Sequence, residues 1–220
     1  PIALESISLE ELLATPIRTG EAGSFGYSLE AMGIKPYLHG YATIDWAQRF
    51  QDGPDLNTFD AHYFNVFVGA NIRDVVTPEI QIETEHGFEF AVRFAQVDVK
   101  VNDYLSVRAG LFLVPFGVYN EYLYPEYISK LPRGPFVLTH DAIVPSAWND
   151  VGVQLRGQYD LGSDRAVNYA VYVVNGLEQN DDPMTPEVES GGGIRGMRHN
   201  FEEEHDPDKA IGGRVGFVPM

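Results

Sequence analysis

The chain has no cysteine among its 220 residues, few basic residues and no long uninterrupted apolar run. Without cysteine there are no disulfides, which fits an exported protein, although many cytosolic proteins also lack cysteine. The absence of a run of about 18 apolar residues argues against a transmembrane helix. With 15 basic against 32 acidic residues, the formal net charge is −17, which argues against nucleic-acid binding.

Motifs for catalysis are also missing. The six histidines lie mostly in separate segments, and His199 and His205, which flank three glutamates, match no zinc-site spacing. No serine lies in a nucleophile elbow. We therefore expect a protein that is not an enzyme and has no cofactor, except for Ca²⁺ or Mg²⁺ held loosely on the acidic stretch between residues 176 and 209. A solvated acidic loop is the simpler interpretation of that stretch.

What the sequence does contain is an apolar period of two that restarts along the chain. In residues 63–73 the even positions from Phe64 to Ile72 are apolar, and most odd positions are polar or small. The pattern returns in residues 105–113 and 151–156. A strand with one apolar face and Arg, Asn and Gln on the other suits a position between lipid and a water-filled interior. The sequence thus predicts an all-β fold, an antiparallel transmembrane β-barrel.

Eight segments fit this strand pattern. One of them, residues 88–101, changes phase, and we expect a bulge near Ala95 and Gln96. The predicted strands are residues 35–48, 60–73, 78–85, 88–101, 105–114, 150–160, 166–175 and 210–218.

The connections between these strands alternate in length. Links at 74–77, 102–104 and 161–165 are short, whereas the loops at 115–149 and 176–209 are long. Short turns at the periplasmic end and long loops outside are typical of outer-membrane barrels, and the short link at 85–87 is the exception. Residues 1–33 form a separate segment, with a short helix near Ser8 and a linker, which we place in the periplasm. No signal peptide precedes it, and Pro1 suggests a mature or trimmed start.

Residues 105–117, LSVRAGLFLVPFG, are followed by YNE at 119–121 and LPR at 131–133. With WNDVGVQ at 148–154, YVVNGL at 172–177 and GGRVG at 212–216, they resemble the phosphate-selective porin O and P type of Gram-negative outer-membrane barrels. The resemblance implies a sixteen-stranded, trimeric porin that contacts lipid and lipopolysaccharide and passes small anionic solutes. Residues 34–220 would then be the first half of that barrel. Residues 8–19 resemble instead the segment before the plug of TonB-dependent receptors, which suggests a periplasmic partner.

Basic side chains on the polar faces of the strands are the candidate solute site. Arginine rings select anions because the guanidinium stays charged and presents forked donors. A turn at 102–104 would place Asp98 opposite Arg108, so the arginines could also serve only to stabilise the wall. The candidate pore-lining residues are Arg108, Arg156, Lys100, Arg214 and Arg73.

The loop at 115–149 is the third at the long-loop end, where porins fold a loop inward to narrow the pore. Its aromatic side chains could line this constriction or pack the loop against the wall. They are Phe116, Tyr119, Tyr122, Tyr124 and Tyr127.

Three functions remain open at this stage. The first is a porin for small hydrophilic solutes, biased toward anions such as phosphate. The second is an outer-membrane barrel that binds a secreted, surface or electron-transfer protein. The third is a soluble β-sandwich with a binding role, which the long loops argue against.

Overall fold

The computed structural model describes most of the strand-forming part of the chain. The described residues are 29, 31–48, 57–87, 89–123, 125, 128, 148–162, 165–176, 178–179, 197–198 and 209–218. The predictions for residues 1–28, for Tyr124 and Tyr127, and for a metal ion on the acidic residues at 180–196 and 199–208 lie outside them.

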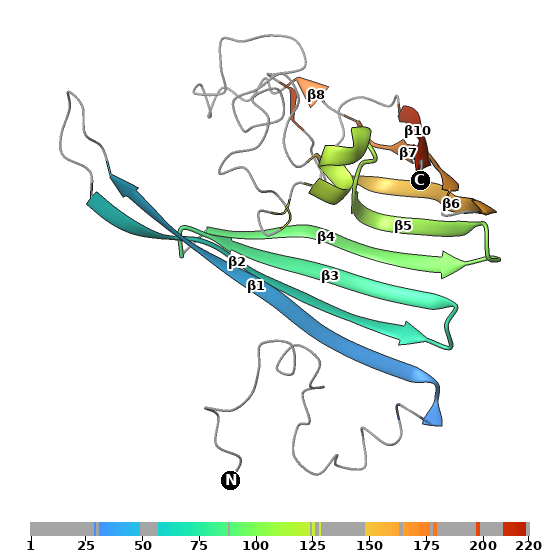
Figure 1. The fold of residues 1–220 in the computed structure, drawn as a ribbon, viewed down its shortest axis with the longest axis horizontal. Coiled ribbons are helices and arrows are strands. Elements are labelled where there is room, and N and C mark those ends of the chain that lie inside the picture. The colour runs from blue at the N-terminus through green and yellow to red at the C-terminus, as the bar shows by residue number, and fades with distance from the viewer. Residues whose placement is uncertain are drawn as a thin grey trace.

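The fold is one antiparallel sheet of eight strands, in the order β1-β2-β3-β4-β5-β6-β7-β10 (Figure 1). Within the described part of the chain, β1 and β10 are its edges, so the sheet is not closed. Two further strands, β8 (Glu178–Gln179) and β9 (Met197–Arg198), pair with each other inside the second long connection. The eight strands are β1 (Ile34–Gln48), β2 (Asn57–Ile72), β3 (Val76–Glu85), β4 (Glu89–Lys100), β5 (Ser106–Leu113), β6 (Asn149–Gly162), β7 (Arg165–Val174) and β10 (Ala210–Val218).

The all-β prediction is confirmed, and each predicted strand bound lies within three residues of the observed one. The period of two locates strands well because alternate side chains must go to opposite faces of a sheet. A short π-helix, η2 (Tyr119–Leu123), follows β5. No helix in the described residues is long and apolar enough to span a membrane.

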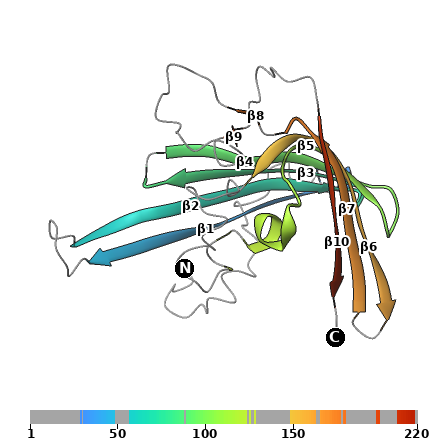
Figure 2. The same ribbon diagram turned by 90° about the horizontal axis from the view of Figure 1, so that it is seen from above.

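The sheet bends, so that it has a convex and a concave face. Figure 2 shows β6, β7 and β10 turned away from the plane of β1 to β4, with η2 (yellow-green) on the concave side. Strand pairing places apolar residues of alternating segments on the convex face, for example Val97, Ala109 and Val153, which are cross-strand neighbours. In the eight strands of the large sheet the charged side chains lie on the concave face, apart from Arg165 at the first position of β7.

The predicted bulge in β4 exists, but two residues earlier than expected. Gln81 pairs with Phe94 and Ile82 pairs with Val92, so Arg93 is the extra residue. The bulge turns Arg93 toward the concave face, where it forms an ion pair with Glu83. The phase of β4 therefore changes before Phe94, which is buried on the concave face.

The period of two in residues 105–113 predicts that Leu113 faces the same side as Ala109 and Leu111, but Leu113 lies on the concave side. It packs with Phe67 and Phe94 in a buried cluster, and only 5% of it is exposed. The chain leaves the sheet after Leu113 and continues to η2 on the concave side, so alternation no longer decides where this side chain points.

A second cluster, of Phe112, Val114, Trp148, Tyr172 and Val174, lies where the long loop at 115–147 leaves β5 and returns to β6. Burial of these side chains attaches the base of the loop to the sheet and stabilises it there. The base is thereby a fixed platform for η2.

Candidate functional site

Two neighbouring cross-strand rows on the concave face carry Arg108, Arg156 and Arg214. The first row joins Asp98, Arg108 and Gln154 on β4, β5 and β6. The second row, one pleat nearer the short turns, joins Arg156, Ala170 and Arg214 on β6, β7 and β10. Side chains at such positions contact each other directly or along the diagonal.

Arg108 and Asp98 form the cross-strand pair expected from the sequence. The Nε and Nη2 of Arg108 each donate to a different Asp98 oxygen at 2.8 Å. The Val101 N–H donates to the Leu105 carbonyl at 3.0 Å and closes the turn that sets this register. The pair is bidentate, the stronger geometry for a guanidinium and a carboxylate.

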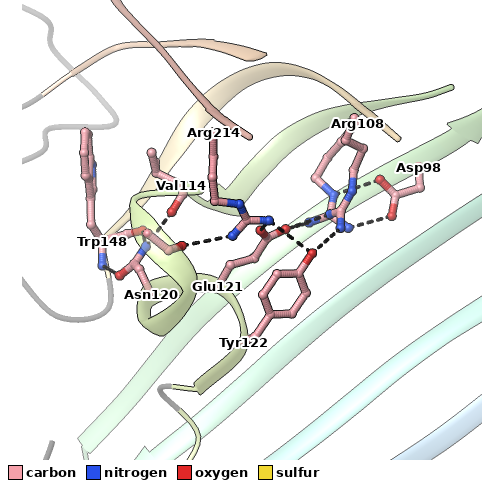
Figure 3. Close-up of polar contacts among 10 residues, drawn as sticks. Asp98, Arg108, Val114, Asn120, Glu121, Tyr122, Trp148 and Arg214 are labelled. Carbon is pink, nitrogen blue, oxygen red and sulfur yellow. Dashed lines mark hydrogen bonds and ion pairs between the residues drawn. The ribbon is translucent and has the colours of Figure 1, made fainter. Parts of the chain in front are cut away.

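Arg156 and Arg214 lie on opposite sides of the small residue Ala170, which is 2% exposed. Since a methyl group fills little space, both long side chains can turn toward the same point above β7. That point is occupied by η2 (Figure 3).

Asn120 holds η2 in place. Its amide donates to the carbonyls of Val114 at 2.7 Å and Trp148 at 2.8 Å, and its oxygen accepts the Trp148 N–H at 2.7 Å. One buried side chain thus joins the start and the end of the 115–147 loop. The Gly117 carbonyl, in a residue with φ of 69°, accepts a further bond of 2.9 Å from Arg214.

This arrangement brings Glu121 among three guanidinium groups. Its carboxylate lies 3.0 Å from Arg156, 2.8 Å from Arg214 and 4.0 Å from Arg108, and its side chain is only 4% exposed (Figure 3). The cluster of Asp98, Arg108, Glu121, Arg156 and Arg214 carries three positive and two negative charges. It is therefore compensated except for one positive charge.

Tyr122 also connects η2 to the sheet, through Arg156 on β6 and Arg214 on β10. Its hydroxyl accepts from Arg156 at 3.2 Å and from Arg214 at 3.3 Å. The Arg214 guanidinium also lies 5.0 Å from the centre of its ring, within cation–π range. Tyr122 is half-exposed, so it forms part of the surface that a solute on the concave side would meet.

A cavity of about 230 Å³ lies beside the cluster, between η2 and the wall strands β5, β6, β7 and β10. Its lining includes Glu121, Tyr122, Arg156 and Arg214, together with Gln154. Gln154 is fully buried, and neither its amide nitrogen nor its oxygen has a hydrogen-bond partner in the described structure.

Two predicted pore-lining residues are not in the cluster. Lys100 belongs to the second row, but its amine turns to Asp103 in the turn, at 2.7 Å. A hydrogen bond from Lys100, and then its charge, lowers the pKa of the Asp103 carboxyl below its usual value. Arg73 lies in the β2–β3 turn with a φ of 53°, and its Nε donates to the Met32 carbonyl at 3.3 Å. Both side chains therefore lie near the short turns and bond there rather than in the cluster.

The described loop aromatics make different contacts. Phe116 packs on Trp148 with ring centres 5.9 Å apart, which attaches the loop base to the wall. Tyr119 is half-buried on η2. Tyr122 contacts Arg156 and Arg214.

Glu121 is the functional residue that the sequence analysis missed. Its place depends on the path of a long loop, which no periodicity encodes. One signal was available, since Glu121 is the single acidic residue among residues 115–123. In the described residues, no group of three His, Asp or Glu side chains is placed to hold a metal ion.

Comparison with known proteins gives one distant relative. A protein of Aquifex aeolicus (strain VF5), described as uncharacterized, is 25% identical over 188 residues. The match covers 82% of this chain and 40% of that protein, so the chain spans less than half of the relative's length. No family model and no solved structure matches the chain.

Proposed function

We propose that this chain forms part of the wall of a bacterial outer-membrane barrel through which small hydrophilic solutes diffuse, with a bias toward anions. The lipid of the membrane would lie against the convex face, and the solute would pass along the concave face. The sequence resemblance at residues 105–117 supports this class of protein.

The apolar convex face, whose one charged strand residue in the described part of the sheet is Arg165 at the start of β7, is the observation that carries the proposal. One cross-strand row runs from Val97 through Ala109, Val153 and Val173 to Ile211 without a polar side chain. Val153 is 49% exposed and Ile211 is 75% exposed. Soluble monomers rarely expose a contiguous apolar surface of more than a few hundred Å². A surface of this kind needs a cover, and lipid covers an entire sheet face without a partner of matching shape.

Aromatic residues near both ends of the convex face fit the same proposal. Trp46, Phe59 and Phe90 lie exposed toward the long-loop end, and Tyr104 and Tyr159 lie toward the short turns. Aromatic girdles mark the two interfaces of outer-membrane barrels. Placed in this way, the eight strands of the large sheet would cross the bilayer with the short turns in the periplasm.

The open edges at β1 and β10 are the starting point for the barrel size and the oligomeric state in the proposal. Each edge carries unpaired backbone groups, which a membrane-spanning sheet must satisfy by closing. The relative extends well beyond the matched region, which leaves room for further strands in a longer chain. A sixteen-stranded barrel assembled as a trimer, in contact with lipopolysaccharide, would follow the porin pattern.

The test is conductance of the complete protein in a planar bilayer separated by a KCl gradient. We expect discrete channel openings and a reversal potential that favours chloride over potassium, because the cluster keeps one uncompensated positive charge. A protein that inserts but conducts nothing would support the barrel scaffold for a protein partner instead. Cation preference would mean that the acidic loops control selectivity.

A further inference from the structure

Glu121 occupies the position that a bound anion would take. Arg108, Arg156 and Arg214 come from β5, β6 and β10, and their guanidinium groups converge on one carboxylate. That carboxylate comes from the loop rather than from the wall, and it is almost completely shielded from water (Figure 3).

The contacts of Glu121 are close but poorly aligned. Both oxygens lie within ion-pair distance of an arginine, yet neither accepts a hydrogen bond of good geometry, and the buried Nε of Arg214 has no acceptor. Charge-assisted hydrogen bonds are strongest when donor and acceptor are aligned, as they are between Arg108 and Asp98. Glu121 therefore neutralises the arginines without saturating their donors.

The neighbouring cavity holds a second unused polar group. Gln154 offers a donor and an acceptor, both buried and unpartnered, beside Arg156 and Arg214. An unpaired buried amide is costly, so the site gains if a molecule binds both of its atoms. A solute with a carboxylate for the arginines and hydroxyl groups for Gln154 would satisfy both parts of the site.

Part of the element that carries Glu121 is exposed. Tyr122 and Leu123, and Val118 just before η2, are each more than two-fifths exposed in the described structure. The clamp of Asn120 lies at the loop base, next to Glu121 but directed away from the cavity. The Glu121 side chain can leave the arginines while the sheet and the clamp stay intact.

We infer that Arg108, Arg156, Arg214 and Gln154 form a binding site for a small hydroxycarboxylate, and that Glu121 is its tethered competitor. The solute carboxylate replaces that of Glu121, and the hydroxyl groups of the solute enter the cavity and bind Gln154. The inference deepens the proposed function, because it names the solute class and the residue that must be displaced for passage.

The test measures binding of gluconate to the complete protein in detergent by calorimetry. In Glu121→Gln the competitor loses its charge but keeps its size, so we expect the apparent affinity for gluconate to rise by about tenfold or more. The matched control is Glu83→Gln, which removes a buried carboxylate on the same face that pairs with Arg93 outside the cluster. It should leave gluconate affinity unchanged.

Two further arms test the solute class. Gln154→Leu in the Glu121→Gln background should reduce affinity for gluconate but not for acetate, which has no hydroxyl group to reach the cavity. Glucose should not bind, and inorganic phosphate should bind more weakly than gluconate. Equal affinity for phosphate and gluconate would overturn the hydroxycarboxylate assignment.

Unchanged or lower gluconate affinity in Glu121→Gln would overturn the role of Glu121 as competitor. Since that variant could also disturb the loop, the emission of Trp148 at the loop base reports whether η2 keeps its place. Glu121→Asp, which withdraws the carboxylate but keeps its charge, should give intermediate affinity in a folded protein. Calorimetry does not require conduction, so a protein that binds gluconate but forms no channel would contradict the proposed function and leave this site standing.

Discussion

At the scale of single residues, Asn120 shows how much one buried amide can decide. All three of its hydrogen-bonding contacts go to backbone groups at the two ends of a long loop. Another side chain could take over these contacts only if it reached backbone groups at both ends of the loop at once. A flexible surface side chain cannot do this. Glu121 follows Asn120 directly, so the clamp also fixes where the carboxylate enters the arginine cluster.

We predict that Asn120→Ala destabilises the folded protein by about 1–3 kcal/mol, because backbone groups of Val114 and Trp148 lose their partners in a buried place. The measurement is the urea midpoint, together with a red shift of the Trp148 emission. Asn102→Ala is the control, since Asn102 accepts one exposed hydrogen bond from the Tyr104 N–H. A loss in Asn120→Ala no larger than in this control would argue against the clamp.

The residues of the site could be predicted from the sequence only in part. Arg108 and Asp98 were expected to pair because a three-residue turn fixes their register, and local register follows from strand alternation. Arg156 and Arg214 were expected on the interior face for the same reason. Their meeting at Glu121 could not be expected, because a loop path is set by the clamp and by packing at its base rather than by any local pattern.

At the scale of elements, the strands are regular where both faces differ strongly in polarity. β6 alternates Val151, Val153 and Leu155 with buried or half-buried polar residues, and its observed bounds are close to the predicted ones. The alternation fails where the local geometry changes, as at the Arg93 bulge and at Leu113. In both places a side chain is turned inward by the backbone, and hydrophobicity alone does not reveal this.

We predict that Val153→Arg costs about 2–4 kcal/mol of unfolding free energy in lipid, because a charge at the membrane midplane is poorly solvated. In a water-exposed sheet the same change would stay within about 0.5 kcal/mol. The control is Gln158→Arg, on the same strand but the opposite face, where the side chain is exposed. Folding into lipid vesicles, followed by urea titration, measures both variants. If both tolerate arginine equally, the convex face of β6 does not contact lipid.

At the scale of the whole molecule, the sheet separates an apolar convex surface from a charged concave one. The concave side holds the ion-pair cluster, the cavity and both buried clusters, and the convex side carries exposed apolar rows across the strands. A sheet with an exposed apolar face and a charged concave face is suited to separate lipid from water. An ordinary soluble sheet instead buries its apolar face and exposes its charged face. The stability of such a molecule therefore depends on what covers the convex face.

The two tryptophans lie on opposite sides of this division and can report it directly. Trp46 is 57% exposed on the convex side of β1, and Trp148 is 8% exposed at the loop base on the concave side. In vesicles of brominated lipid, the emission of a Trp148→Phe variant, which keeps only Trp46, should be strongly quenched. The emission of a Trp46→Phe variant, which keeps only Trp148, should be nearly unaffected. Because bromine quenches only near contact, quenching of Trp148 instead of Trp46 would place lipid on the concave face and reverse the assignment. Quenching of neither would mean that protein rather than lipid covers the convex surface, as in the soluble β-sandwich alternative.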